Sequence, residues 1–203
     1  MNMKSRFARV RSILPVALLV TFVGTASAHP GHTGHEITGI GWGLTHPFSG
    51  LDHLLAMIAV GLWAVQLGGR ALWALPLSFV GAMAVGGALG MSGVAVPQVE
   101  PLILGSALAL GALVAMAARL PLVVSALIVG ASALLHGQAH GAELPAGANG
   151  WMAALGFVTA TAALHGAGLG GGWLLQQVAT RRAVRVAGAA IVIAAALLGL
   201  DVF

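Results

Sequence analysis

Long apolar runs alternate with short polar breaks along most of the chain, and this alternation predicts a helical membrane protein. Charged residues, prolines and polar clusters separate six apolar segments, each close to the roughly 20 residues that a helix needs to cross a bilayer. The segments are Trp42–Leu67, Ala71–Met91, Pro101–Ala118, Pro121–His140, Trp151–Leu175 and Val184–Val202. The sequence therefore predicts an all-α, polytopic domain of six transmembrane helices over residues 42–203.

The first 28 residues have the pattern of a secretory signal peptide. A short apolar stretch from Ile13 to Gly24 is followed by Ala26-Ser27-Ala28 and preceded by four basic residues, Lys4, Arg6, Arg9 and Arg11. This order favours cleavage after Ala28 over the alternative, an uncleaved first helix. The mature chain then begins with segment 29–41, on the periplasmic side of a bacterial inner membrane.

Composition agrees with a membrane protein and narrows its function. Hydrophobic residues make up 59% of the chain and charged residues only 7%, whereas soluble domains are much more charged. The absence of cysteine excludes disulfides and thiolate metal ligands. The net charge of +4 arises from the four basic residues of the signal peptide, so the mature chain is formally neutral. Nucleic-acid binding therefore has no support.

The charged residues between the segments predict the orientation. The loops that follow the first, third and fifth segments hold all the basic residues of the mature chain, and the opposite loops hold Glu100 and Glu143. Because cytoplasmic loops carry the excess of arginine and lysine, we expect a mature N-terminus and a C-terminus, with Asp201, both outside. The basic residues are Arg70, Arg119, Arg181, Arg182 and Arg185.

Ionisable side chains inside apolar segments are candidate functional groups, because burying them in a membrane is costly. His136 and His140 are four residues apart and share one helix face. Glu143 continues their stripe if the helix extends that far, or lies in the loop close by if the helix ends near Gly141. Two imidazoles and a carboxylate form a set of metal ligands that suits Ni²⁺, Zn²⁺, Co²⁺ or Fe²⁺. The full set of candidates in the membrane is His46, Asp52, His53, His136, His140, Glu143 and His165.

Spacing in the first segment bears on how these groups are arranged. His46 and His53 share a face, but in a straight helix they stand about 10 Å apart, so one ion reaches both only if the helix bends. The intervening Pro47 favours a helix start or a kink beside His46, and Asp52 is either a second ligand or an orienting partner for an imidazole. On the predicted topology, the candidates descend from an outer group through Asp52 and His53 to His165, as a path for a cation would.

Further histidines follow the predicted cleavage site, in "HPGHTGHE". His29, His32, His35 and Glu36 are either a metal-collecting tract or an ordinary exposed terminus. For the membrane residues, the alternatives to metal or proton transport are hydrogen bonds that only hold helices together, an intramembrane metal-dependent hydrolase and a haem-binding subunit. The wide spread in depth argues against the compact shell of a hydrolase.

Two motifs, "HPFSGLDH" (46–53) and "LHGQAHGAE" (135–143), resemble the signatures of the HupE/UreJ family of bacterial membrane proteins. The first matches in full, and the second has Leu135 where the family usually has phenylalanine. The resemblance implies a six-helix nickel permease that serves hydrogenase or urease maturation, with a cytoplasmic nickel chaperone as a possible partner. It also implies that the metal is cargo, not a permanently bound cofactor. The motif residues that it implies matter for transport are His46, Asp52, His53, His136, His140 and Glu143. His165 lies outside both motifs.

Overall fold

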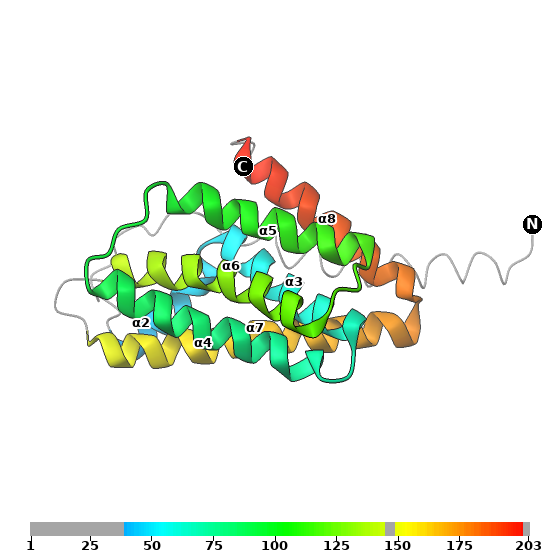
Figure 1. Ribbon diagram of the computed structural model, residues 1–203, viewed down its shortest axis with the longest axis horizontal. Coiled ribbons are helices and arrows are strands. Elements are labelled where there is room, and N and C mark those ends of the chain that lie inside the picture. Colours follow the sequence, from blue (N-terminus) through cyan, green and yellow to red (C-terminus); the bar gives the residue numbers. More distant parts are fainter. Residues whose placement is uncertain (1–38, 145–148, 201–203) are drawn as a thin grey trace, which may run out of the picture.

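The computed structural model describes residues 39–144 and 149–200, and every regular element within them is a helix (Figure 1). The predicted signal peptide, its cleavage site, Asp201 and the histidines at 29, 32 and 35 lie outside these residues. The helices are α2 (Ile40–Thr45), the 3-10 helix η1 (His46–Phe48), α3 (Leu51–Leu67), α4 (Ala71–Met91), α5 (Val99–Met116), α6 (Leu122–Ala142), α7 (Gly150–Val178) and α8 (Arg181–Gly199). The all-α prediction is confirmed for the described part of the chain.

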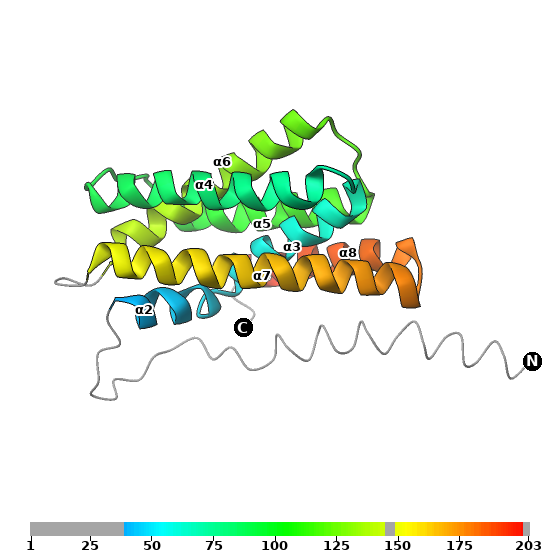
Figure 2. The ribbon, with the colours of Figure 1, turned by 90° about the horizontal axis from the view of Figure 1, so that it is seen from below.

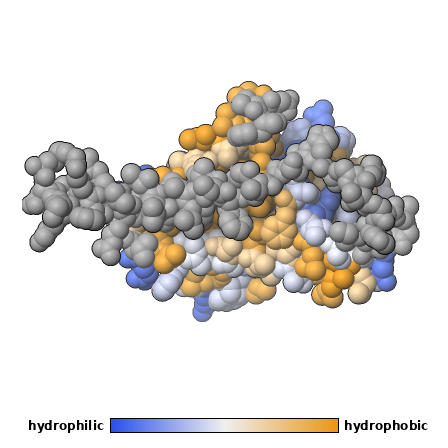
Figure 3. Space-filling model, turned by 180° about the vertical axis from the view of Figure 1, so that it is seen from behind, coloured by the Kyte–Doolittle hydropathy of each residue, from blue (hydrophilic) through white to orange (hydrophobic). Residues whose placement is uncertain are grey.

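The five helices from α4 to α8 are each long and apolar enough to cross a membrane. The pair formed by residues 40–48 and α3 passes the same test only when taken together, as a broken span or a re-entrant loop, so the described residues hold five or six candidate spans. The bounds of α4 are those predicted from the sequence, whereas α8 begins three residues before the predicted Val184. Hydrophobic residues form large patches on the face shown in Figure 3. Among the apolar side chains, Leu77, Val123, Leu127 and Ile193 are 60% to 70% exposed. Such a surface suits lipid and not water.

The helices alternate in direction, so their turns gather at two opposite ends of the bundle (Figure 1). We call one the histidine end; it holds the turn between α4 and α5 and the C-terminus of α6. The other, the arginine end, holds the turns after α3, α5 and α7, with Arg70, Arg119 and Arg182. Exposed tryptophans lie near both ends, as they do where membrane proteins meet the lipid headgroups: Trp151 at the histidine end, and Trp73 and Trp173 at the other.

The first span is broken between η1 and α3, where the axis turns by 84°. Pro47 lies in the first turn of η1, where its missing N–H costs no helical hydrogen bond. Gly50 then takes an extended conformation, with φ −102° and ψ 115°, before α3 begins. The sequence predicts a helix start or a kink beside His46. The structure places the break after Phe48 and before Leu51, so that His46 and His53 lie on opposite sides of it.

Buried α3 and close helix pairs fix the positions of the histidines. Nearly all of α3 from Leu55 to Ala64 is buried, and the helix packs on α4, α5, α7 and α8. Helix α4 lies along α6, where a Cβ at Gly137 would collide with the carbonyl oxygen of Met83. Figure 2 shows α7 running the length of the bundle with α2 beside its first turns. Glycines thus let the helices that carry the histidines approach backbone to backbone.

Candidate metal centre

A polar cavity of about 180 Å³ opens at the histidine end and receives most of the predicted ligands. The break in the first span, the first turn of α5 and the C-terminal turn of α6 bound it. Three imidazoles and three carboxylates share the cavity with a hydroxyl and a glycine. The lining residues are His46, Ser49, Gly50, Asp52, His53, Glu100, His140 and Glu143. Their donor atoms are nitrogen and oxygen, which are suitable ligands for divalent transition metals.

Three of these residues already stand close enough to hold one ion. His46, His140 and Glu143 each offer a ligand atom, and the three atoms lie within 4.8 Å of one another. Ligands bound to one ion at about 2.1 Å are at most about 4.2 Å apart, so small side-chain rotations would close the set. His46 Nε2 donates to a Glu143 carboxylate oxygen at 2.8 Å, and a metal would replace that shared proton.

His53 is oriented by its neighbour. One carboxylate oxygen of Asp52 accepts both the backbone N–H and the Nδ1–H of His53, each at 2.8 Å. This contact leaves Nε2 with a free lone pair, and Nε2 is buried without a hydrogen-bond partner among the described residues. A Cβ at Gly50 would come within 3 Å of both groups. Of the two roles predicted for Asp52, the geometry therefore shows the orienting one.

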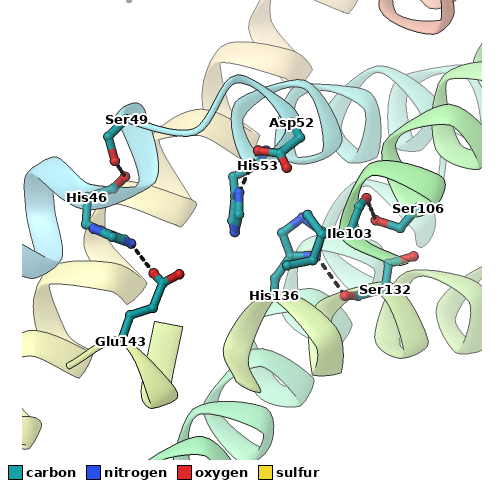
Figure 4. Close-up of polar contacts among 9 residues, drawn as sticks. All are labelled: His46, Ser49, Asp52, His53, Ile103, Ser106, Ser132, His136 and Glu143. Carbon is teal, nitrogen blue, oxygen red and sulfur yellow. Dashed lines mark hydrogen bonds and ion pairs between the residues drawn. The ribbon is translucent and has the colours of Figure 1, made fainter. Parts of the chain in front are cut away.

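His136 repeats this arrangement from the opposite side. Its Nδ1–H donates to the Ser132 carbonyl at 2.8 Å, and its buried Nε2 has no partner in the part of the chain that the structure describes. The His53 ring centre lies 4.9 Å from that of His136 and 4.6 Å from that of His140. Figure 4 shows His53 and His136 turned toward each other beside the His46–Glu143 pair. Fixing the proton on one ring nitrogen and freeing the other is how proteins prepare a histidine for a metal.

The predicted gradation in depth is wrong for the two motifs. The 84° bend brings both His46 and His53 against His140, with ring centres 5.1 Å and 4.6 Å away. The estimate of about 10 Å between the two first-motif histidines assumed a straight helix. Motif residues on three elements therefore form one compact group.

His165 is the exception, since it lies deeper than this group. It sits near the middle of α7 and is 1% exposed. The ring of Phe79 contacts both it and the group, with its centre 4.9 Å from that of the His165 ring and 5.5 Å from that of His136. The structure thus places His165 behind an aromatic side chain, and it does not line the cavity.

Sequence analysis missed three residues of this region. Glu100 counts in the sequence only as a charge of an outer loop, but it lines the cavity. Its position directly before Pro101, where an apolar segment begins, was the one local signal that it lies close to the bundle. Phe157 stacks on His140 with ring centres 4.4 Å apart, and Phe79 is fully buried among histidines. In the sequence these two phenylalanines look like any lipid-facing residue.

Comparison with known proteins agrees with the motifs. Residues 16–198 match the family described as "HupE / UreJ protein". The chain is 47% identical over 167 residues to "Protein HupE" of Rhizobium leguminosarum bv. viciae, a match that covers 82% of this chain and 87% of that protein. No solved structure matches.

Proposed function

The chain belongs to the HupE/UreJ family, and from that premise we propose that it is an inner-membrane permease that imports Ni²⁺ from periplasm to cytoplasm. The nickel would serve a hydrogenase or a urease, with Co²⁺, Zn²⁺ and Fe²⁺ as possible competitors. The observation that carries the proposal is the group of His46, His140 and Glu143, with the free Nε2 atoms of His53 and His136 beside it.

This group supports a site for a partly dehydrated cation. Imidazole and carboxylate ligands are offered at the mouth of an otherwise apolar bundle, and an ion leaving water there exchanges hydration for protein ligands. His46 and Glu143 are partly exposed, with side chains 24% and 47% accessible, whereas His140 is 3% exposed. An arriving ion would therefore meet the exposed pair first and the buried rings afterwards.

The direction of transport rests on the distribution of charge. Carboxylates gather at the histidine end, and Arg70, Arg119, Arg182 and Arg185 lie at the opposite end. Under the positive-inside rule, the arginine end is cytoplasmic. This orientation agrees with a signal peptide cleaved after Ala28 and a periplasmic histidine-rich start. A divalent ion moving toward an interior at −100 mV gains about 4.6 kcal/mol, so the membrane potential alone favours entry.

Family membership also bears on the alternatives. The family comprises accessory or transport proteins and no known enzymes, so we propose that the metal is cargo, released to a cytoplasmic chaperone. The predicted spread of the ligands in depth argued against a hydrolase, which needs a compact shell of ligands. Because the structure shows a compact group, that argument no longer holds. No other feature of the described residues favours hydrolysis, however, so transport remains the proposal.

The test is uptake of radioactive nickel by cells that lack their own nickel importers. Wild type, His136→Ala and the control Thr159→Ala would be compared at matched expression. Thr159 is exposed on α7, and its hydroxyl bonds only to the Leu155 carbonyl. The proposal expects uptake with wild type and the control, and a loss of at least about tenfold with His136→Ala, as removal of a ligand should cause.

Two results would count against the proposal. Absence of uptake by wild type would contradict nickel transport. Equal uptake by wild type and His136→Ala would make the buried ring structural. Competition by cobalt, zinc and iron in the same assay would define the selectivity.

A further inference from the structure

No hydrogen bond within the described part of the chain accounts for His165. It is buried near the middle of α7, and neither ring nitrogen has a hydrogen-bond partner among the described residues. Buried polar groups are nearly always paired, and an unpaired one calls for an explanation such as an absent ion or water. A leucine would fill this position without leaving ring nitrogens unsatisfied.

The position of His165 relative to the metal centre supplies an explanation. It lies about 22 Å along α7 from the first residue of that helix at the histidine end, at 1.5 Å per residue. Phe79 is fully buried and contacts both the His136 ring and the His165 ring, edge to face. One aromatic ring thus links the buried His136 to the next imidazole, His165.

Other atoms at this depth are also suited to passing an ion. Thr161, one turn before His165 on the same helix, is fully buried and donates its hydroxyl to the Met83 sulfur at 3.5 Å. Met83 lies one turn from Phe79 on α4. A buried hydroxyl and a thioether therefore lie within one helical turn of His165 and Phe79, respectively.

We infer that His165 is a second ligand site for the divalent cation. The outer group consists of His46, His53, His136, His140 and Glu143. The ring of Phe79 separates His165 from this group and must move aside for the ion to advance. The inference rests on the proposed transport and extends it. Two sites separated by a hydrophobic constriction allow an ion to be held weakly and passed on, whereas a single tight cage would retain it.

The first test separates uptake from binding. His165→Leu removes the ring nitrogens and fills the space, so it should lower nickel uptake by at least about tenfold while the Kd of the outer group changes by less than about threefold. His165→Asn, which keeps a polar side chain, is the second variant, and Thr159→Ala is the control. Thermal melting of each purified protein accompanies the measurements.

The outcomes distinguish the inference from the proposed function. Absence of uptake by wild type defeats the proposed function. Normal uptake by either His165 variant defeats the inference alone. A Kd that weakens as much as uptake falls, or a loss of folding in both variants, would make His165 part of the outer group or of the packing, and would also overturn the inference.

The second test addresses the phenylalanine, and it uses the absence of native cysteines. His165→Cys and Ser49→Cys would be treated, in right-side-out membrane vesicles, with a thiol reagent that does not cross membranes. Ser49 lines the open cavity, so we expect its variant to react at least about tenfold faster than the residue behind the ring. Adding Phe79→Ala should raise the rate at position 165 toward that at 49. Equal rates in the single variants, or no effect of Phe79→Ala, would contradict the inference that the ring of Phe79 blocks access to position 165.

Discussion

The two ends of the bundle offer a cation opposite surroundings. At the histidine end, the cavity of about 180 Å³ holds three carboxylates and three imidazoles. At the arginine end, a cavity of about 270 Å³ is lined by Gln66, Gln176 and the guanidinium groups of Arg119 and Arg185, with apolar neighbours. By the charges of their lining residues, the first cavity attracts a cation and the second repels it. On the proposed function, the difference separates capture from release.

The largest expected effect comes from removing His140, which lies against both histidines of the first motif. His140 contacts both His46 and His53, so His140→Ala deletes a shared ligand. Nickel affinity of the purified protein should fall by about 100-fold or more, beyond the 10- to 100-fold typical of outer-shell changes. Equilibrium dialysis with radioactive nickel measures it. An affinity within threefold of wild type would show that the cavity at the histidine end does not bind the nickel.

A smaller loss is expected when a ligand is kept but its support is changed. In Asp52→Asn the amide oxygen still accepts one hydrogen bond, but the carboxylate charge that holds Nδ1–H of His53 is gone. Nickel affinity should fall about 10- to 100-fold. Because His53 itself remains, a loss equal to that of His53→Ala would instead make Asp52 a direct ligand.

Glu100→Gln tests a residue that the sequence did not mark as part of the site. Glu100 lines the cavity but is not among the three groups that already converge. Removing its charge should reduce uptake at low nickel concentration by about tenfold, and raising the nickel concentration should restore the rate, because attraction and not the final step is impaired. A defect that saturating nickel does not correct would contradict this role.

The smallest effect is expected at the other end. Arg119→Gln removes one positive charge from the arginine-end cavity, far from the ligands, so nickel affinity should change by less than about twofold. The same dialysis measurement checks it. An effect as large as that of Glu100→Gln would show that the two ends do not act separately.

Local patterns predicted the helices well, because each span carries its own signal of length and hydrophobicity. The bounds of α4 agree with the sequence, and the shared face of His136 and His140 follows from their spacing. Pro47 marked a break, but the 84° turn depends on how α2 packs on α7, which no local pattern contains.

The arrangement of the site was harder to predict, because it arises between helices. The approach of His53 to His140 and the contacts of Phe79 with two imidazoles join residues far apart in the chain. The depths predicted for His46 and His53 were wrong for the same reason. A straight helix would separate the two residues in depth, whereas the bend brings both against His140.

On the proposed function, this chain alone moves nickel through the histidine end. The most direct test uses purified protein in liposomes that contain a nickel-sensitive dye, with an inside-negative potential and no ATP. The account predicts that wild type fills the liposomes with nickel, that collapsing the potential slows the filling, and that His140→Ala abolishes it. A wild type that leaves the dye unchanged in folded, nickel-binding form, or a His140→Ala variant that fills the liposomes at the same rate, would contradict it.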